Sequence, residues 1–125
     1  MIDFIKFLED GITSQQEYAE KSGLGLVGPL DFMPASVRYK IMVEMIGHII
    51  EEAVETRMLI PRRPWKRNEE AFDDSEEGAK EFCKEVTDIL LFIRGLMAYS
   101  GISPQFFEAA FNEKLHYNKV REDHK

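Results

Sequence analysis

Two short acidic clusters have the spacing that brings carboxylates onto one face of a helix. Residues 51–55 read EEAVE, so Glu52 and Glu55 are three residues apart. Residues 85–88 read EVTD and repeat that interval. At about 100° per residue, such pairs lie about 60° apart around an α-helix. Each cluster can therefore offer two oxygen ligands in one direction.

Glu85 distinguishes a metal site from a solvated acidic surface. It lies in line with Ile89, Phe92 and Leu96, so its helical position is on the core-facing stripe or at its edge. An ionised carboxylate there is costly unless it is paired or coordinates a metal. All-oxygen ligation suits Mg²⁺, with Mn²⁺ as a substitute, and no Cys or His joins the clusters at the spacing that zinc needs. We expect a metal cage made by Glu52, Glu55, Glu85 and Asp88.

A basic stripe near the C-terminus offers complementary chemistry. Lys114, Asn118 and Arg121 follow one another at intervals of four and three residues. Alone, such cations would offset the dipole at a helix C-terminus. Beside a metal cage, they would form a clamp for a polyphosphate.

Four helices are expected to position these groups. Apolar residues recur every three or four positions in segments 2–21, 35–59, 75–99 and 104–120, and no segment alternates as a strand does. Ser103 followed by Pro104 is a strong helix start. The fold class is therefore all-α, a four-to-five-helix bundle forming a single domain over residues 1–125.

Composition narrows the class of protein. The 125 residues are 44% hydrophobic with a net charge of −7, which fits one globular domain and argues against nucleic-acid binding. The longest apolar run, Ile89 to Ile93, is far shorter than the ~20 residues of a membrane helix. One cysteine, Cys83, and a start without signal-peptide features favour a cytoplasmic location.

The ordered motifs resemble a known superfamily. Glu51-Glu52-x-x-Glu55, Glu85-x-x-Asp88 and Lys114-x-x-x-Asn118-x-x-Arg121 are similar to the motifs of the all-α nucleoside triphosphate pyrophosphohydrolases. That superfamily includes the MazG-type enzymes and the dimeric dUTPases and dCTPases, some from bacteriophages. The resemblance covers residues 38 to 121, and Trp65-Lys66 resembles a pair found in the dUTPase-like branch.

The resemblance implies an activity and roles for these residues. It implies Mg²⁺-dependent conversion of a dNTP, dUTP or dCTP first, to dNMP and pyrophosphate. Glu51 and Glu52 would be catalytic, with Glu51 orienting a water, and the substrate would be bound by Lys114, Asn118, Arg121, Trp65 and Lys66. Base contacts would come from the first helix, where Gln15 and Gln16 are candidates. A homodimer or dimer of dimers is expected, without nucleic-acid or membrane partners.

Two alternatives stay open at this stage. One is a broad-specificity MazG-like enzyme that removes noncanonical nucleotides. The other is a non-catalytic helical interaction module with solvated acidic faces. His48, four residues before Glu52, is interpreted as a supporting or core histidine rather than a metal ligand.

Overall fold

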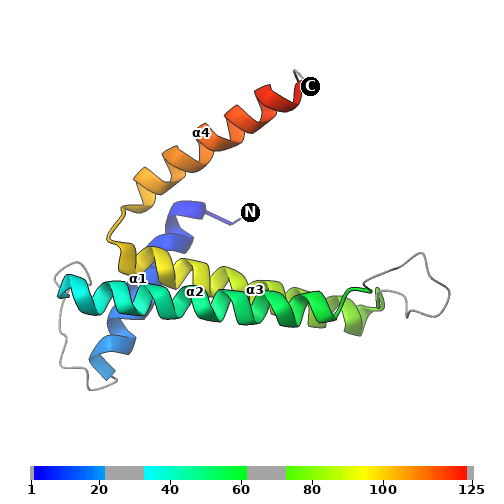
Figure 1. Ribbon diagram of the computed structural model, residues 1–125, viewed down its shortest axis with the longest axis horizontal. Coiled ribbons are helices and arrows are strands. Elements are labelled where there is room, and N and C mark those ends of the chain that lie inside the picture. Colours follow the sequence, from blue (N-terminus) through cyan, green and yellow to red (C-terminus); the bar gives the residue numbers. More distant parts are fainter. Residues whose placement is uncertain (1, 22–32, 62–72, 124–125) are drawn as a thin grey trace.

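Four α-helices make up the fold in this computed structural model, which describes residues 2–21, 33–61 and 73–123. They are α1 (Phe4–Lys21), α2 (Ala35–Met58), α3 (Glu76–Ser100) and α4 (Pro104–Asp123) (Figure 1). The described ranges contain no β-strand. The prediction of an all-α chain with four helices is confirmed, and the helix boundaries agree closely with the expected segments.

The central unit is the antiparallel pair of α2 and α3, which has the most extensive contact between helices (Figure 1). α1 crosses this pair and packs mainly on α3. α4 packs on α1 and diverges from the pair, because the chain bends by 119° between α3 and α4. No single described helix is long and apolar enough to cross a membrane. Only α3 and α4 taken together, across their bend, have the length and the composition of a membrane span.

The start of α3 is fixed by a side-chain cap. The Ser75 hydroxyl oxygen accepts a hydrogen bond from the Gly78 N–H at 3.2 Å, and Asp73 accepts bonds from the N–H and hydroxyl of Ser75. A Cβ at position 78 would overlap the side chain and carbonyl of Asp73. Glycine is therefore needed at Gly78 for Asp73 to approach the cap.

Local residues also determine the turn from α3 to α4. Gly101 adopts a φ of 75°, the left-handed conformation that ends many helices. Ser103 then caps α4 by accepting the Phe106 N–H at 3.1 Å, with Pro104 at the first helical position. These local signals determine where α3 stops and α4 begins.

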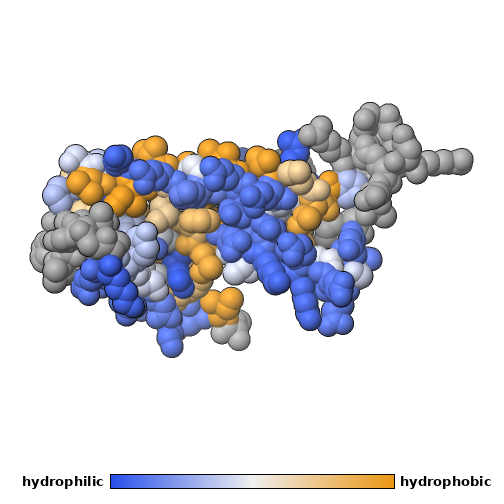
Figure 2. All heavy atoms as spheres, turned by 90° about the horizontal axis from the view of Figure 1, so that it is seen from below, coloured by the Kyte–Doolittle hydropathy of each residue, from blue (hydrophilic) through white to orange (hydrophobic). Residues whose placement is uncertain are grey.

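The core lies at one end of the helix pair. Met33, Ala98 and Tyr99 are buried together, and Tyr99 is only 2% exposed. Ile12, Ile41, Met42 and Met45 pack around them. Many apolar side chains elsewhere lie at the surface among hydrophilic ones (Figure 2), although Leu8 on α1 is also buried. The acidic halves of α2 and α3 extend beyond this core.

Candidate metal centre and adjoining pocket

Three of the four expected cage carboxylates come together between α2 and α3. Glu52, Glu85 and Asp88 each offer an oxygen, and these oxygens lie within 4.8 Å of one another. The spacing of 85 and 88 places both side chains on the side of α3 that faces α2, as the sequence predicted. The arrangement can hold one hard cation, because such ions prefer several carboxylate oxygens.

The two central carboxylates are poorly solvated. Glu52 and Glu85 are half-buried, and one oxygen of each is shielded from solvent with no hydrogen-bond partner among the described residues. Burial, a hydrogen bond to Glu85, and the charges of Glu55, Asp88 and Glu85 raise the pKa of Glu52 to about 7. One carboxyl can hydrogen-bond another only when it carries a proton. This contact therefore favours the protonated form of Glu52, and neither Glu52 nor Glu85 forms a salt bridge with another described residue.

Glu55 and Glu51 lie at the margin of this cluster. Glu55 is exposed and outside the group of oxygens that meet, although its charge contributes to the raised pKa of Glu52. Glu51 is also exposed, and its Oε2 lies 3.6 Å from Nδ1 of His48. The structure thus brings together three of the expected ligands and leaves Glu55 within electrostatic reach.

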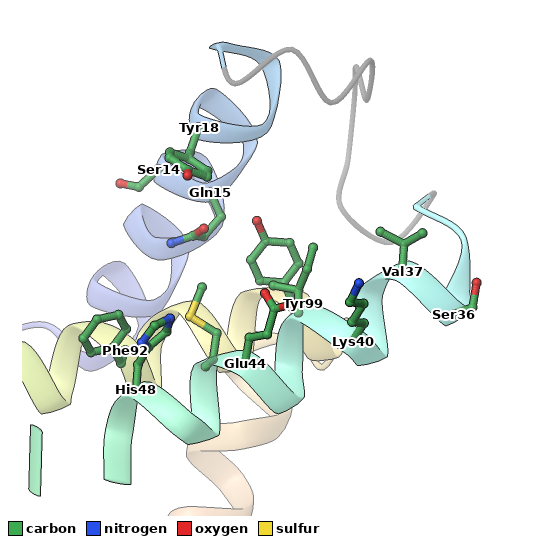
Figure 3. A pocket seen from close by; sticks show the side chains of 12 residues that line it. Ser14, Gln15, Tyr18, Ser36, Val37, Lys40, Glu44, His48, Phe92 and Tyr99 are labelled. Atoms are coloured by element: carbon green, nitrogen blue, oxygen red, sulfur yellow. The ribbon is translucent and has the colours of Figure 1, made fainter. Parts of the chain in front are cut away.

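An open pocket lies beside the acidic cluster, between α1 and α2 with α3 at its base. Its volume is about 940 Å³. In Figure 3, Gln15 and Tyr18 reach it from α1, and the Tyr99 hydroxyl points toward α1. The rest of the lining combines apolar side chains with polar ones, namely Ser14, Ser36, Lys40, Glu44 and His48. Such a mixture suits an organic ligand that has polar edges.

The pocket ends about one helical turn from the acidic cluster, at His48 and Phe92. The rings of His48 and Phe92 stack with centroids 5.1 Å apart at the pocket edge (Figure 3). His48 is four residues before Glu52, and Phe92 is four residues after Asp88, so each ring is about 6 Å along its helix from a carboxylate. One ligand can therefore contact both the pocket and the carboxylates.

The basic stripe on α4 is not brought to the acids within one chain. The 119° bend directs α4 away from α2 and α3 (Figure 1), and Phe4 packs on Phe107 and Phe111 at centroid distances of 5.5 Å. Lys114 lies over the Tyr117 ring at 5.2 Å, and Oδ1 of Asn118 is shielded without a partner in the described ranges. Arg121 is exposed near the helix end. The spacing predicted a shared face on α4, but not the direction of that helix.

Two expected substrate-binding residues, Trp65 and Lys66, lie outside the described residues. The sequence interpretation did not identify Tyr99, Phe92 or Lys40 as pocket residues. Apolar periodicity places Phe92 and Tyr99 on the core side of α3, and only the crossing of α1 turns that side into a pocket wall. Of the two candidates for base contacts, Gln15 lines the pocket and Gln16 does not.

Comparisons of this chain with models of protein families, with curated proteins and with solved structures found no match.

Proposed function

We propose that this protein is a Mg²⁺-dependent nucleoside triphosphate pyrophosphohydrolase that converts a dNTP, with dUTP or dCTP as first candidates, to dNMP and pyrophosphate. The observation that carries the proposal is the pair of facing carboxylates, Glu52 and Glu85, each with a buried oxygen that has no partner in the described chain. The order of the three motifs, which resembles that superfamily, supports the same activity.

The residues fit a hard divalent cation. Glu52, Glu85 and Asp88 would hold it, and Glu55 would add a negative charge nearby. A cation would give the shielded oxygens the positive partner that they lack. When bound, such a metal neutralises phosphate oxygens and makes water a better nucleophile.

The reaction is a displacement at the α-phosphorus. A water oxygen forms a bond to that phosphorus, and the bond from it to the oxygen bridging to the β-phosphorus breaks, so that pyrophosphate leaves. Glu51, at the exposed edge of the cluster, is the proposed base that orients the water and takes its proton. The negative charge of the four acids would repel a free triphosphate, so we expect activity to require the metal absolutely.

The nucleoside end would occupy the adjoining pocket. Its volume of about 940 Å³ is at the upper end of the ~300–1,000 Å³ typical of ligand sites. The His48–Phe92 ring pair offers an aromatic surface next to the acids, and the Gln15 amide offers donors and acceptors to a base edge. A triphosphate tail would then reach the carboxylates one helical turn away.

The test is a panel of dNTPs and NTPs incubated with the purified protein and Mg²⁺, with products separated by chromatography. The proposal predicts monophosphate and pyrophosphate in equal amounts, with dUTP or dCTP turned over fastest. Similar rates for all bases would instead support the broad-specificity MazG-like alternative. Release of single phosphates, or no turnover of any substrate, would contradict the proposal, and the second result would favour a helical interaction module.

A further inference from the structure

Tyr99 combines a buried ring with a hydroxyl that has no hydrogen bond to a described residue. Its side chain is only 2% exposed and belongs to the core with Met33 and Ala98. Figure 3 shows the hydroxyl directed into the pocket, toward α1. A buried hydroxyl costs free energy when it lacks a hydrogen-bond partner, and a phenyl ring would fill the same space without that cost. The hydroxyl therefore indicates a partner that enters the pocket.

At neutral pH this hydroxyl can act as a donor and as an acceptor. Burial first of all, and then Tyr18 on α1, raises the pKa of Tyr99 above its ordinary value of 10.0, so the hydroxyl keeps its proton. Because the O–H bond rotates, the same group can donate to a carbonyl oxygen or accept from an N–H. The edges of nucleobases present both kinds of group.

The amide of Gln15 lies on the same face of α3 as Tyr99. A Cβ at Gly95 would be 3.2 Å from the amide nitrogen of Gln15, so the glycine lets this amide lie close to α3. Gly95 and Tyr99 are four residues apart and therefore share one face of the helix. The amide and the hydroxyl thus border the same part of the pocket (Figure 3).

That face of α3 leads from Tyr99 to the acidic cluster. Asp88, Phe92 and Tyr99 follow one another at intervals of four and seven residues, so they lie in a line along the helix. The distance from Asp88 to Tyr99 along the helix axis is about 16 Å. A nucleotide that lies along α3 can therefore present its base to Tyr99 and its phosphates to the acids.

We propose that Tyr99 is a specificity-determining residue of the pocket, whose hydroxyl forms a hydrogen bond to the base of a bound nucleotide beside the Gln15 amide. The assignment rests on the proposed function for the class of ligand. Both groups can present a donor or an acceptor, by rotation of the hydroxyl or of the amide. Tyr99 therefore favours ligands that have a polar base edge, and it stabilises uracil and cytosine to a similar extent.

The matched variants Tyr99→Phe and Tyr39→Phe test this assignment. Each removes one hydroxyl, and Tyr39 is 56% exposed on α2, outside the pocket lining. Titration calorimetry with dUMP and dCMP needs no turnover. Tyr99→Phe should raise the Kd about 5-fold or more for both nucleotides, whereas Tyr39→Phe should bind them as the wild type does. 2-Deoxyribose 5-phosphate, which has no base, should show no difference among the three proteins.

Thermal unfolding separates base recognition from a structural role. Since the hydroxyl has no hydrogen bond to the described chain, Tyr99→Phe should have a Tm equal to or above that of the wild type. A lower Tm together with weaker binding of 2-deoxyribose 5-phosphate would overturn the assignment. So would equal Kd values for the wild type and Tyr99→Phe, or no binding of either nucleotide by the wild type. Binding that depends on Tyr99 without turnover of any triphosphate would support the assignment and contradict the proposed enzymatic activity alone.

Discussion

Glu52 on α2 faces Glu85 on α3, and each carboxylate holds one oxygen away from solvent without a hydrogen-bond partner in the described ranges. Asp88 adds a third oxygen within 4.8 Å. Helices that pack through apolar side chains have no structural need for facing acids, and burying them costs free energy of folding. This relationship is the basis of the proposed metal centre and of the predictions below.

The first prediction concerns pH and metal binding. The pKa of Glu52 is raised from 4.5 to about 7, first of all by burial. Between these values the folded chain keeps a proton that the unfolded chain has lost, so the contribution of Glu52 to stability is complete below pH 4.5 and is lost as the pH rises through about 7. Mg²⁺ binding requires the ionised carboxylate. We therefore expect Mg²⁺ to raise the Tm more at about pH 8 than at about pH 6.

A matched pair of variants isolates this effect. Glu52→Gln removes the titrating group and should abolish the pH dependence of the Mg²⁺ effect on Tm. Glu81→Gln removes an exposed acid one turn before Glu85 and should leave the dependence intact. An equal Tm increase at both pH values in the wild-type protein would argue against a metal centre at Glu52.

The second prediction concerns the pocket. His48→Ala removes a ring that stacks on Phe92 beside the acids. If the nucleoside binds there, KM should rise while kcat changes less, because the ring contacts the substrate in its ground state and transition state alike. His116→Ala is the control, since His116 is exposed on α4. Equal kinetics for the two variants would place the nucleoside elsewhere.

The third prediction concerns the α4 cations. By analogy with the loss of one preorganised donor, the motif pattern predicts a kcat decrease of about 10²-fold for Lys114→Ala or Arg121→Ala, without a change in metal affinity. The direction of α4 leads to a different expectation for an isolated chain, namely a kcat close to that of the wild type. Steady-state kinetics of both variants decide between the two. A large decrease would mean that α4 reaches the acids in the active assembly.

The fourth prediction concerns the crossing of α1 and α3. Gly11 is buried against Arg94, whose guanidinium lies 5.1 Å from the centroid of the Phe7 ring. A methyl group at position 11 would overlap Cγ of Arg94, which cannot move without displacing the side chain from that ring. Gly11→Ala should therefore destabilise the fold by about 1–3 kcal/mol, measured by urea unfolding. Gly47→Ala, at an open position of α2, should be neutral or stabilising in the monomer.

The sequence predicted what depends on local periodicity. Helical spacing predicted the helical segments and the inward position of Glu85, and the Ser103–Pro104 signal predicted the start of α4. Ser75 illustrates the limit, because a capping box has Glu or Gln three residues after the serine and this chain has Gly78 there. The structure shows that Gly78 instead leaves room for Asp73 to support the cap.

How the helices are arranged relative to one another could not be predicted from the sequence in the same way. The direction of α4 depends on the backbone of the Gly101 turn and on packing of Phe107 against Phe4, which helical spacing does not encode. The pocket depends on the crossing of α1 over α3, where Gln15 comes close to Gly95. Lys40 and Tyr99 had no recognisable signal, because each has its role only when three helices meet.

The most direct test of the central claim is pyrophosphate release from dUTP and dCTP by the wild type and by Glu85→Gln, with Mg²⁺ and with a chelator. The substitution keeps the shape of the side chain and removes one charge from the facing pair. We expect release by the wild type only when Mg²⁺ is present, and a loss of about 10²-fold or more in Glu85→Gln, with helicity retained and stability without metal unchanged or higher. Turnover by Glu85→Gln at the wild-type rate would contradict the metal centre.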